Sequence, residues 1–225
     1  MFSCLNSELY IAIIGDIKES KKIDNRDEVQ KKLKSILEDM NTRYQEDISS
    51  NFIITLGDEF QGLLCNGARL MQIISEIEER MYPINIRFGV GIGKITTEIN
   101  RELSIGADGP GYYNARAAIE SLKEDEKRKR INAANVRFEA EEEKHSTVMM
   151  LNTITTLLMA IKDTWSDRQR EVICEMLVHG ESQVDVAKRL GVNQSTVQKI
   201  LAKGKFYAYK DALDTIDKVM GEINV

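Results

Sequence analysis

The stretch NFIITLGDEFQGLLC, residues 51–65, decides the fold. Two runs typical of β-strands, Phe52–Leu56 and Phe60–Cys65, are separated only by Gly57, Asp58 and Glu59. A connection of this length, with glycine and aspartate in it, is typical of a β-hairpin. We therefore expect two adjacent antiparallel strands.

Strand and helix patterns alternate on both sides of this hairpin. Apolar residues at helical spacing predict helices over 26–44 and 68–81, and short apolar runs predict strands over 9–14 and 84–92. The resulting order is βαββαβ, the ferredoxin-like arrangement. We expect a helix over 112–122 and a strand over 133–138 to follow, so the predicted fold class is α+β.

The composition indicates a soluble protein. Of the 225 residues, 42% are hydrophobic, which is enough to form one large core or two small ones. No stretch reaches the roughly 18 consecutive apolar residues of a membrane span, and no signal peptide opens the chain, so we expect a cytoplasmic protein. Cys4, Cys65 and Cys174 show no CxxC spacing and indicate neither a zinc site nor a disulfide framework.

The charge distribution singles out the C-terminal third. The net charge is −5, but a basic run begins at Lys188 and contains no acidic residue until Asp211. Its cations are Lys188, Arg189, Lys199, Lys203, Lys205 and Lys210. Because nucleic-acid binding depends on local charge rather than on the total, this run is a candidate DNA-binding surface.

The basic run overlaps two short helical patterns separated by Gly191. The small residue Ala187 in the first pattern favours close helix packing, Gly191 permits a tight turn, and Asn193 can cap the second helix. The second helix exposes residues of the kinds that hydrogen-bond base edges and phosphates, namely Gln194, Ser195, Thr196, Gln198 and Lys199. The alternative is an ordinary helical hairpin used for packing.

Residues 165–198 resemble the helix-turn-helix of sigma factor region four and of LuxR-type regulators. The matching segments are WSDRQREV (165–172), QVDVAKRLGV (183–192) and STVQ (195–198). The resemblance implies a recognition helix that begins at residues 194–199 and phosphate contacts made by Arg168, Arg170, Lys188 and Lys203. Since the chain has no segment resembling a promoter-melting or polymerase-binding region, we expect a regulator that binds double-stranded DNA.

Two carboxylates mark a second candidate site. Asp16 follows the first predicted strand, and Asp58 lies in the hairpin. The first strand lies beside the hairpin in a βαββαβ fold, so both groups can converge. Together with a backbone carbonyl, for which Ile17 is the candidate, they predict a site for Mg²⁺ or Mn²⁺ that also binds substrate phosphates. The alternative is that each aspartate is a turn residue.

These motifs resemble the palm domains of class III nucleotide cyclases and GGDEF diguanylate cyclases, over residues 9–122. RFGVGIG (87–93) resembles the cyclase strand before its glycine turn, and Gly109 with Asn114 resembles the start of the catalytic helix. The resemblance implies nucleotide contacts at Gly57, Glu59, Gly109, Asn114 and Arg116. Asn114 and Arg116 are also the candidate catalytic residues.

The sequence departs from the cyclase pattern at two places. Cyclases place an arginine four residues after the helix asparagine, whereas this chain has Ala118 there and its nearest arginine is Arg116. Leu56 replaces the first glycine of the GGDEF motif. The whole arrangement, with a helix-turn-helix behind it, is similar to the SatD family.

We expect a palm domain over 1–145, a connector helix over 146–164 and a helix-turn-helix domain over 165–225. The apolar connector is expected either to form a homodimer interface or to dock onto its own two domains. The function predicted from this organisation is ligand-responsive transcriptional regulation. An active metal-dependent nucleotidyl cyclase or transferase with an accessory helix-turn-helix is the alternative.

Overall fold

The computed structural model describes residues 9–128, 134–179 and 182–223, and it confirms a mixed α+β fold built on a five-stranded sheet. The strands are β1 (Tyr10–Ile17), β2 (Ile48–Leu56), β3 (Glu59–Leu64), β4 (Ile86–Gly93) and β5 (Val136–Glu139). Their order across the sheet is β2-β3-β1-β4-β5. The first four strands pair antiparallel, and β5 lies parallel to β4 at the edge.

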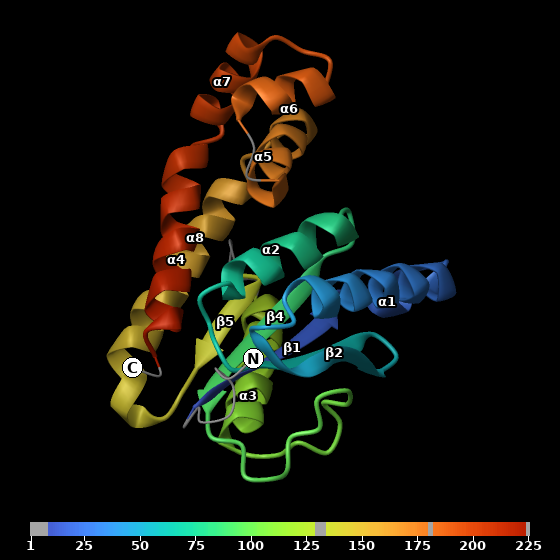
Figure 1. Cartoon of the computed structure of the whole chain (residues 1–225), viewed down its shortest axis with the longest axis vertical. Helices are drawn as coiled ribbons and strands as arrows, with labels where there is room; N and C mark the ends of the chain where they lie inside the picture. The colour runs from blue at the N-terminus through green and yellow to red at the C-terminus, as the bar shows by residue number, and fades with distance from the viewer. Residues whose placement is uncertain (1–8, 129–133, 180–181, 224–225) are drawn as a thin grey trace.

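Helices cover both faces of this sheet (Figure 1). The helices of the N-terminal part are α1 (Arg26–Arg43), α2 (Leu70–Met81) and α3 (Pro110–Lys127), with a short 3₁₀ turn η1 (Ser20–Lys22) before α1. Alternate residues of β1 point to opposite faces: Ile11 and Ile13 pack with α1 and α2, while Ala12 and Ile14 pack with α3. The elements from β1 to β4 follow the order β-α-β-β-α-β. Helix α3 covers the face of the sheet that is opposite to α1 and α2.

The remaining described chain after β5 is helical. The elements are the 3₁₀ turn η2 (Glu142–Lys144), α4 (His145–Lys162), α5 (Asp167–His179), α6 (Gln183–Arg189), α7 (Gln194–Lys203) and α8 (Phe206–Gly221). Figure 1 shows α5, α6 and α7 beyond α2, at the end of the molecule away from the sheet, and α8 returning beside α4. None of the described helices is long and apolar enough to span a membrane.

The predicted elements are present, and several are longer than expected. β1 continues to Ile17, so Asp16 lies inside the strand and not after it, contrary to the prediction. The last strand begins at Val136, and residue 133 of its predicted range lies outside the described residues. Cys65, buried directly after β3, is disulfide-bonded, so the expectation of no disulfide is wrong for this residue.

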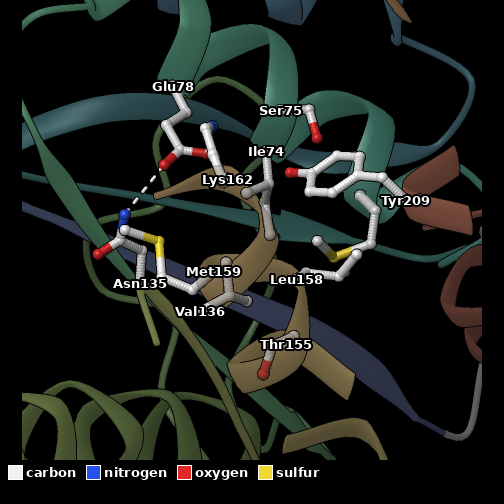
Figure 2. Close-up of a pocket in the computed structure, with 11 residues that line it drawn as sticks. Ile74, Ser75, Glu78, Asn135, Val136, Thr155, Leu158, Met159, Lys162 and Tyr209 are labelled. Atoms are coloured by element: carbon white, nitrogen blue, oxygen red, sulfur yellow. Dashed lines mark hydrogen bonds and ion pairs between the residues drawn. The ribbon is translucent and has the colours of Figure 1, made fainter. Parts of the chain in front are cut away.

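A buried charged cluster joins α4 to α2. The ammonium group of Lys162, whose side chain is 5% exposed, lies 2.7 Å from Glu78 and 2.5 Å from Glu79. Figure 2 shows Lys162 and Glu78 beside Asn135, which donates a hydrogen bond of 3.0 Å to Glu78, at a small cavity of about 30 Å³. Burial opposes the charge on Lys162, but the nearby carboxylates raise its pKa above the usual value.

Trp165 fixes the start of α5 to the junction between α7 and α8. Its indole N–H donates a 2.8 Å hydrogen bond to the carbonyl oxygen of Gly204, and its ring lies 4.8 Å from that of Tyr209. A buried tryptophan satisfies its single donor in this way. This aromatic contact therefore links the start of α5 to α8.

The C-terminal helix α8 contributes a cap to α2. The carboxylate of Asp217 accepts a 2.6 Å hydrogen bond from the backbone N–H of Met71, in the first turn of α2, where the backbone donors have no partner within the helix. Burial raises the pKa of Asp217 to about 7, despite the helix N–H groups that favour its charge.

We predict that Asp217 makes stability fall as the pH rises. The folded protein holds this proton up to about pH 7, whereas the unfolded chain releases it near 3.8, so ionisation opposes folding across that window. Asp217→Asn keeps an acceptor oxygen but cannot ionise. Its melting temperature relative to wild type should rise by about 4 °C or more between pH 5 and pH 8.

The matched control is Asp211→Asn on the same helix, because Asp211 is exposed and does not contribute to the raised pKa of Asp217. It removes the same charge from solvent and should leave the pH profile of the melting temperature unchanged. Parallel profiles for both variants would contradict the assignment to Asp217.

Candidate functional site

A row of three charged residues crosses the sheet on the face covered by α3. Asp16 on β1 lies opposite Glu59 on β3 and opposite Arg87 on β4. Residues directly opposite one another in antiparallel strands project from the same face. Asp16 is buried, with 6% of its surface exposed, so its charge requires partners within the protein.

Helix α3 supplies a matching row of charges. Arg116 holds both carboxylate oxygens of Glu59, at 2.5 and 2.6 Å. Lys123 lies 3.3 Å from Oδ1 of Asp16, and Arg87 donates to Oδ2 of the same carboxylate. Glu126 then accepts from Arg87 at 2.6 and 3.0 Å.

The glycines of β4 explain why α3 lies this close to the sheet. A Cβ atom on Gly91 would lie 2.0 Å from the carbonyl oxygen of Gly111 on α3, and one on Gly89 would lie 2.3 Å from that of Ala115. A Cβ on Gly93 would lie 2.7 Å from the backbone nitrogen of Gly111. Glycine at alternate positions therefore provides a flat surface on which the helix backbone rests.

The charges in this row reinforce one another. Burial opposes ionisation of Glu126, but hydrogen bonds from Arg87 and Lys18 outweigh it and hold the pKa of Glu126 below its usual range. The hydrogen bonds to Glu59 raise the pKa of Arg116. These groups therefore remain charged at neutral pH, and each has an oppositely charged partner.

Asp58, Gly57 and Ile17 lie at the same end of the sheet. Gly57 has φ +61° and occupies the tight turn of the hairpin. Ile17 is buried, and its backbone N–H donates to the carbonyl oxygen of Asp58 at 3.1 Å. The carboxylate of Asp58 is partly exposed and forms no ion pair within the described part of the chain.

The fit of a divalent cation to this site is incomplete. Among residues 9–128, 134–179 and 182–223, no group of three or more His, Cys, Asp or Glu side chains is arranged to hold a metal. Asp16 already has two cationic partners, Arg87 and Lys123. A Mg²⁺ or Mn²⁺ ion would therefore bind through Asp16 and Asp58 only if a phosphate ligand and water completed its coordination.

The residues compared with the cyclase helix are engaged inside the protein. The amide of Asn114 donates a 2.8 Å hydrogen bond to the carbonyl oxygen of Ile92, and Arg116 is held by Glu59. Gly109 caps α3 with φ +146°, where a Cβ would lie 2.7 Å from the carbonyl oxygen of Lys94. The structure thus brings Asp16, Glu59 and Arg116 together, while Asn114 faces β4.

A tight turn joins helices α6 and α7. Gly191 follows α6 with φ +64°; its N–H donates to Lys188, and the N–H of Val192 donates to the carbonyl oxygen of Ala187. This pair of hydrogen bonds defines a Schellman motif, in which glycine is preferred because of its left-handed backbone. Asn193 occupies the cap position of α7, but its side chain forms no capping hydrogen bond, contrary to the prediction.

Helix α7 has one buried and one exposed face. Val197 and Leu201 are fully buried against the neighbouring helices. The exposed residues include all those predicted to contact DNA from this helix, namely Gln194, Ser195, Thr196, Gln198, Lys199 and Lys203. Lys188 on α6 is also exposed.

The two arginines of α5 differ in their surroundings. Arg168 is exposed and pairs with Glu171, one turn along the helix. Arg170 lies 3.3 Å from Glu79 of α2 and over the ring of Tyr82, 4.6 Å from its centre. The charge of Arg170 thus fixes α5 to α2, whereas a phosphate contact by this residue stays a prediction.

Sequence reasoning missed Arg87, Lys123 and Glu126. A charged segment such as the one after residue 122 usually indicates a solvated loop or helix end, yet Lys123 and Glu126 face the sheet. The available signal was their spacing: Arg116, Lys123 and Glu126 fall on one side of a helix, above strands that carry opposite charges.

The fold and this charged site define an α+β protein with a helical C-terminal part. The model of the SatD family matches residues 10–215, so the chain belongs to the SatD family. Among solved structures, the chain is similar to the catalytic core of a rhodopsin-guanylyl cyclase with converted specificity in complex with ATPalphaS. That similarity has a TM-score of 0.39 at 16% identity and covers 51% of this chain and 73% of the other. The comparison with curated proteins found no match.

Proposed function

We propose that this protein is a DNA-binding transcriptional regulator whose N-terminal part binds a divalent metal together with a nucleotide. The observation that carries the proposal is the exposed polar and basic face of α7. Burial of Val197 and Leu201 orients Gln194, Gln198 and Lys199 toward solvent, and these are side-chain types that contact base edges and phosphates.

The cations around α7 support this assignment. Lys188, Lys199, Lys203 and Lys205 are exposed and form no ion pair with any described residue. Figure 1 places α7 at the end of the molecule, so the sheet does not cover it. A helix of this kind at an exposed end fits the major groove of a DNA duplex.

For the N-terminal part we propose a ferredoxin-like palm domain over 1–145, linked by 146–164 to a helix-turn-helix domain over 165–225. Asp16 and Asp58 would bind Mg²⁺ or Mn²⁺, with Gly57, Glu59 and Gly109 beside the nucleotide. The engagement of Asn114 by Ile92 and of Arg116 by Glu59 favours a sensor over an active cyclase, because neither side chain is free to contact a reacting phosphate.

We predict that Lys199→Glu combined with Lys203→Glu weakens binding to all duplex DNA and flattens its salt dependence, because phosphate contacts release counterions when they form. Gln194→Ala or Gln198→Ala should instead relax sequence preference, with discrimination between bases reduced by about 1 to 3 kcal/mol at each position read. Fluorescence anisotropy across a salt series, with genomic fragments and with unrelated DNA, measures both effects.

The control combines Lys21→Glu and Lys32→Glu, which change the net charge equally at exposed positions near and in α1. This variant should bind DNA as wild type does. Absence of salt-dependent retention of any genomic fragment by the wild-type protein would refute the regulator assignment.

We also propose a homodimer, since two copies read two half-sites. Helix α4 packs on β5 and buries Val148 and Leu151, so one face of this helix docks onto its own chain. Met149 and Leu157 lie on its outer side, where they are 58% and 60% exposed. Met149→Asp with Leu157→Asp should convert a dimer to a monomer in analytical ultracentrifugation, whereas Leu103→Asp should not. A monomeric wild type at micromolar concentration would contradict the proposal.

We predict that Mn²⁺ with ATP or GTP raises the melting temperature of the wild-type protein, because ligands that bind the folded state stabilise it. Asp16→Asn and Asp58→Asn should each abolish this rise, while Asp24→Asn, an exposed control, should retain it. We expect the nucleotide to remain intact. Turnover that is abolished in both variants would favour the nucleotidyl cyclase or transferase, and identical responses from all four proteins would refute the metal site at Asp16 and Asp58.

A further inference from the structure

A cavity of about 230 Å³ lies where helix α2 packs against α5 and α8. Helix α2 covers the sheet, whereas α5 and α8 belong to the helical C-terminal part. In a protein core, a cavity of roughly 150 Å³ is enough to bind benzene. The cavity between these three helices therefore has room for a small organic molecule.

One wall of the cavity is apolar. Its residues come from α5 and α8 and are Met176, Leu177, Val178 and Leu213. The ion pair between Lys210 and Asp214 also lines the cavity, and these two side chains are 44% and 59% exposed. The cavity therefore opens to solvent beside this pair, so a ligand can enter from there.

The opposite wall carries buried and half-buried carboxylates, one of which has no cationic partner. Glu76 is paired with Arg43, and Glu79 with Lys162, in each case at 2.5 Å. Asp217 forms no ion pair within the described part of the chain; its carboxylate accepts from backbone N–H groups at the start of α2. Asp217 is thus the carboxylate of this cavity whose charge the described residues leave unneutralised.

We propose that this cavity binds a small organic cation in which a primary ammonium group is carried on an apolar chain. The ammonium pairs with the carboxylate of Asp217, and the chain lies against the apolar wall formed by α5 and α8. Such a ligand gains both from neutralising a charge that is removed from water and from burying its chain. Because it contacts α2 and α5 at once, it stabilises the junction between the sheet and the helical part. This site is separate from the proposed metal and DNA sites and does not depend on either.

The charge of Asp217 makes binding depend on pH. Burial raises the pKa of Asp217 to about 7, so this carboxyl is mostly protonated at pH 6 and mostly ionised at pH 8. Since the ammonium binds the ionised form, its affinity should rise about tenfold between these two pH values. The other ionisable side chains that line the cavity are Glu76 and Glu79 on α2 and Lys210 and Asp214 on α8, while α5 contributes only apolar ones.

The test is isothermal titration calorimetry of the full chain with n-alkylammonium chlorides, from propyl to hexyl, and with n-hexanol as the neutral counterpart. Each added methylene should tighten binding about fourfold, which is the effect of burying one CH₂ group. At pH 8 hexylammonium should bind about tenfold more tightly than hexanol, because only the cation pairs with Asp217.

Two variants separate the charge from the apolar wall. Asp217→Asn should weaken hexylammonium binding about tenfold at pH 8, abolish its pH dependence and leave hexanol binding within about threefold of wild type. Met176→Ala shortens the apolar wall and should weaken both ligands about fivefold. The control Asp211→Asn removes a charge from an exposed position of α8 outside the cavity and should bind as wild type does. Thermal melting establishes that each variant is folded.

Three results would overturn the proposal. The first is the absence of saturable binding of every alkylammonium to the wild-type protein at pH 8. The second is an equal affinity for hexylammonium and hexanol, because Asp217 would then recognise no charge. The third is hexylammonium binding that is unchanged in both Asp217→Asn and Met176→Ala, because the ligand would then lie outside this cavity.

Discussion

The direct contact between the backbones of α3 and β4 is the constraint on which the candidate site depends. Gly89, Gly91 and Gly93 present no side chain to the helix, and a Cβ at Gly91 would meet a carbonyl oxygen at 2.0 Å. Because α3 lies so close, the side chains of Arg116 and Lys123 can reach charged groups in the middle of the sheet. A larger separation would leave Asp16 with Arg87 alone, and buried carboxylates require full neutralisation.

A second constraint joins the helical part to the sheet. Lys162 is almost fully buried and is paired with two adjacent carboxylates of α2, Glu78 and Glu79. Separating α4 from α2 would leave these charges without partners, and removal of one member of a buried pair is strongly destabilising. Since Glu79 also holds Arg170 of α5, the same group of charges sets where the C-terminal helices begin. The hydrophobic core likewise runs without interruption from Ile11 in the sheet to Met220 in α8.

Local patterns in the sequence predicted the helices and strands, but they could not predict which charged side chains pair across the fold. The alternation around Gly57 predicted the hairpin, and the requirement for a positive φ at Gly191 was readable because few residues other than glycine adopt it. The sequence did not predict that β1 extends to Ile17, because aspartate is a poor strand former. Asp16 is tolerated in the strand because Arg87 and Lys123 neutralise it. These partners lie more than 70 residues away in the chain, beyond the reach of periodicity. For the same reason the contact of Arg170 with α2 could not be predicted, and only the resemblance to helix-turn-helix modules gave this residue a role, as a phosphate contact.

The two constraints meet in one continuous series of polar contacts. From Asp16 it passes through Arg87 and Glu126 to Lys18, which lies 2.7 Å from Glu126 and donates to Asn135 at 2.5 Å. The series then continues from Asn135 through Glu78, Lys162 and Glu79 to Arg170 on α5. Arg87, Lys18 and Lys162 each contact two acceptors at the same time, so each of these cations links two neighbouring groups of the series. The charged row beside α3 and the cluster that fixes α5 to α2 are therefore parts of one set of polar contacts.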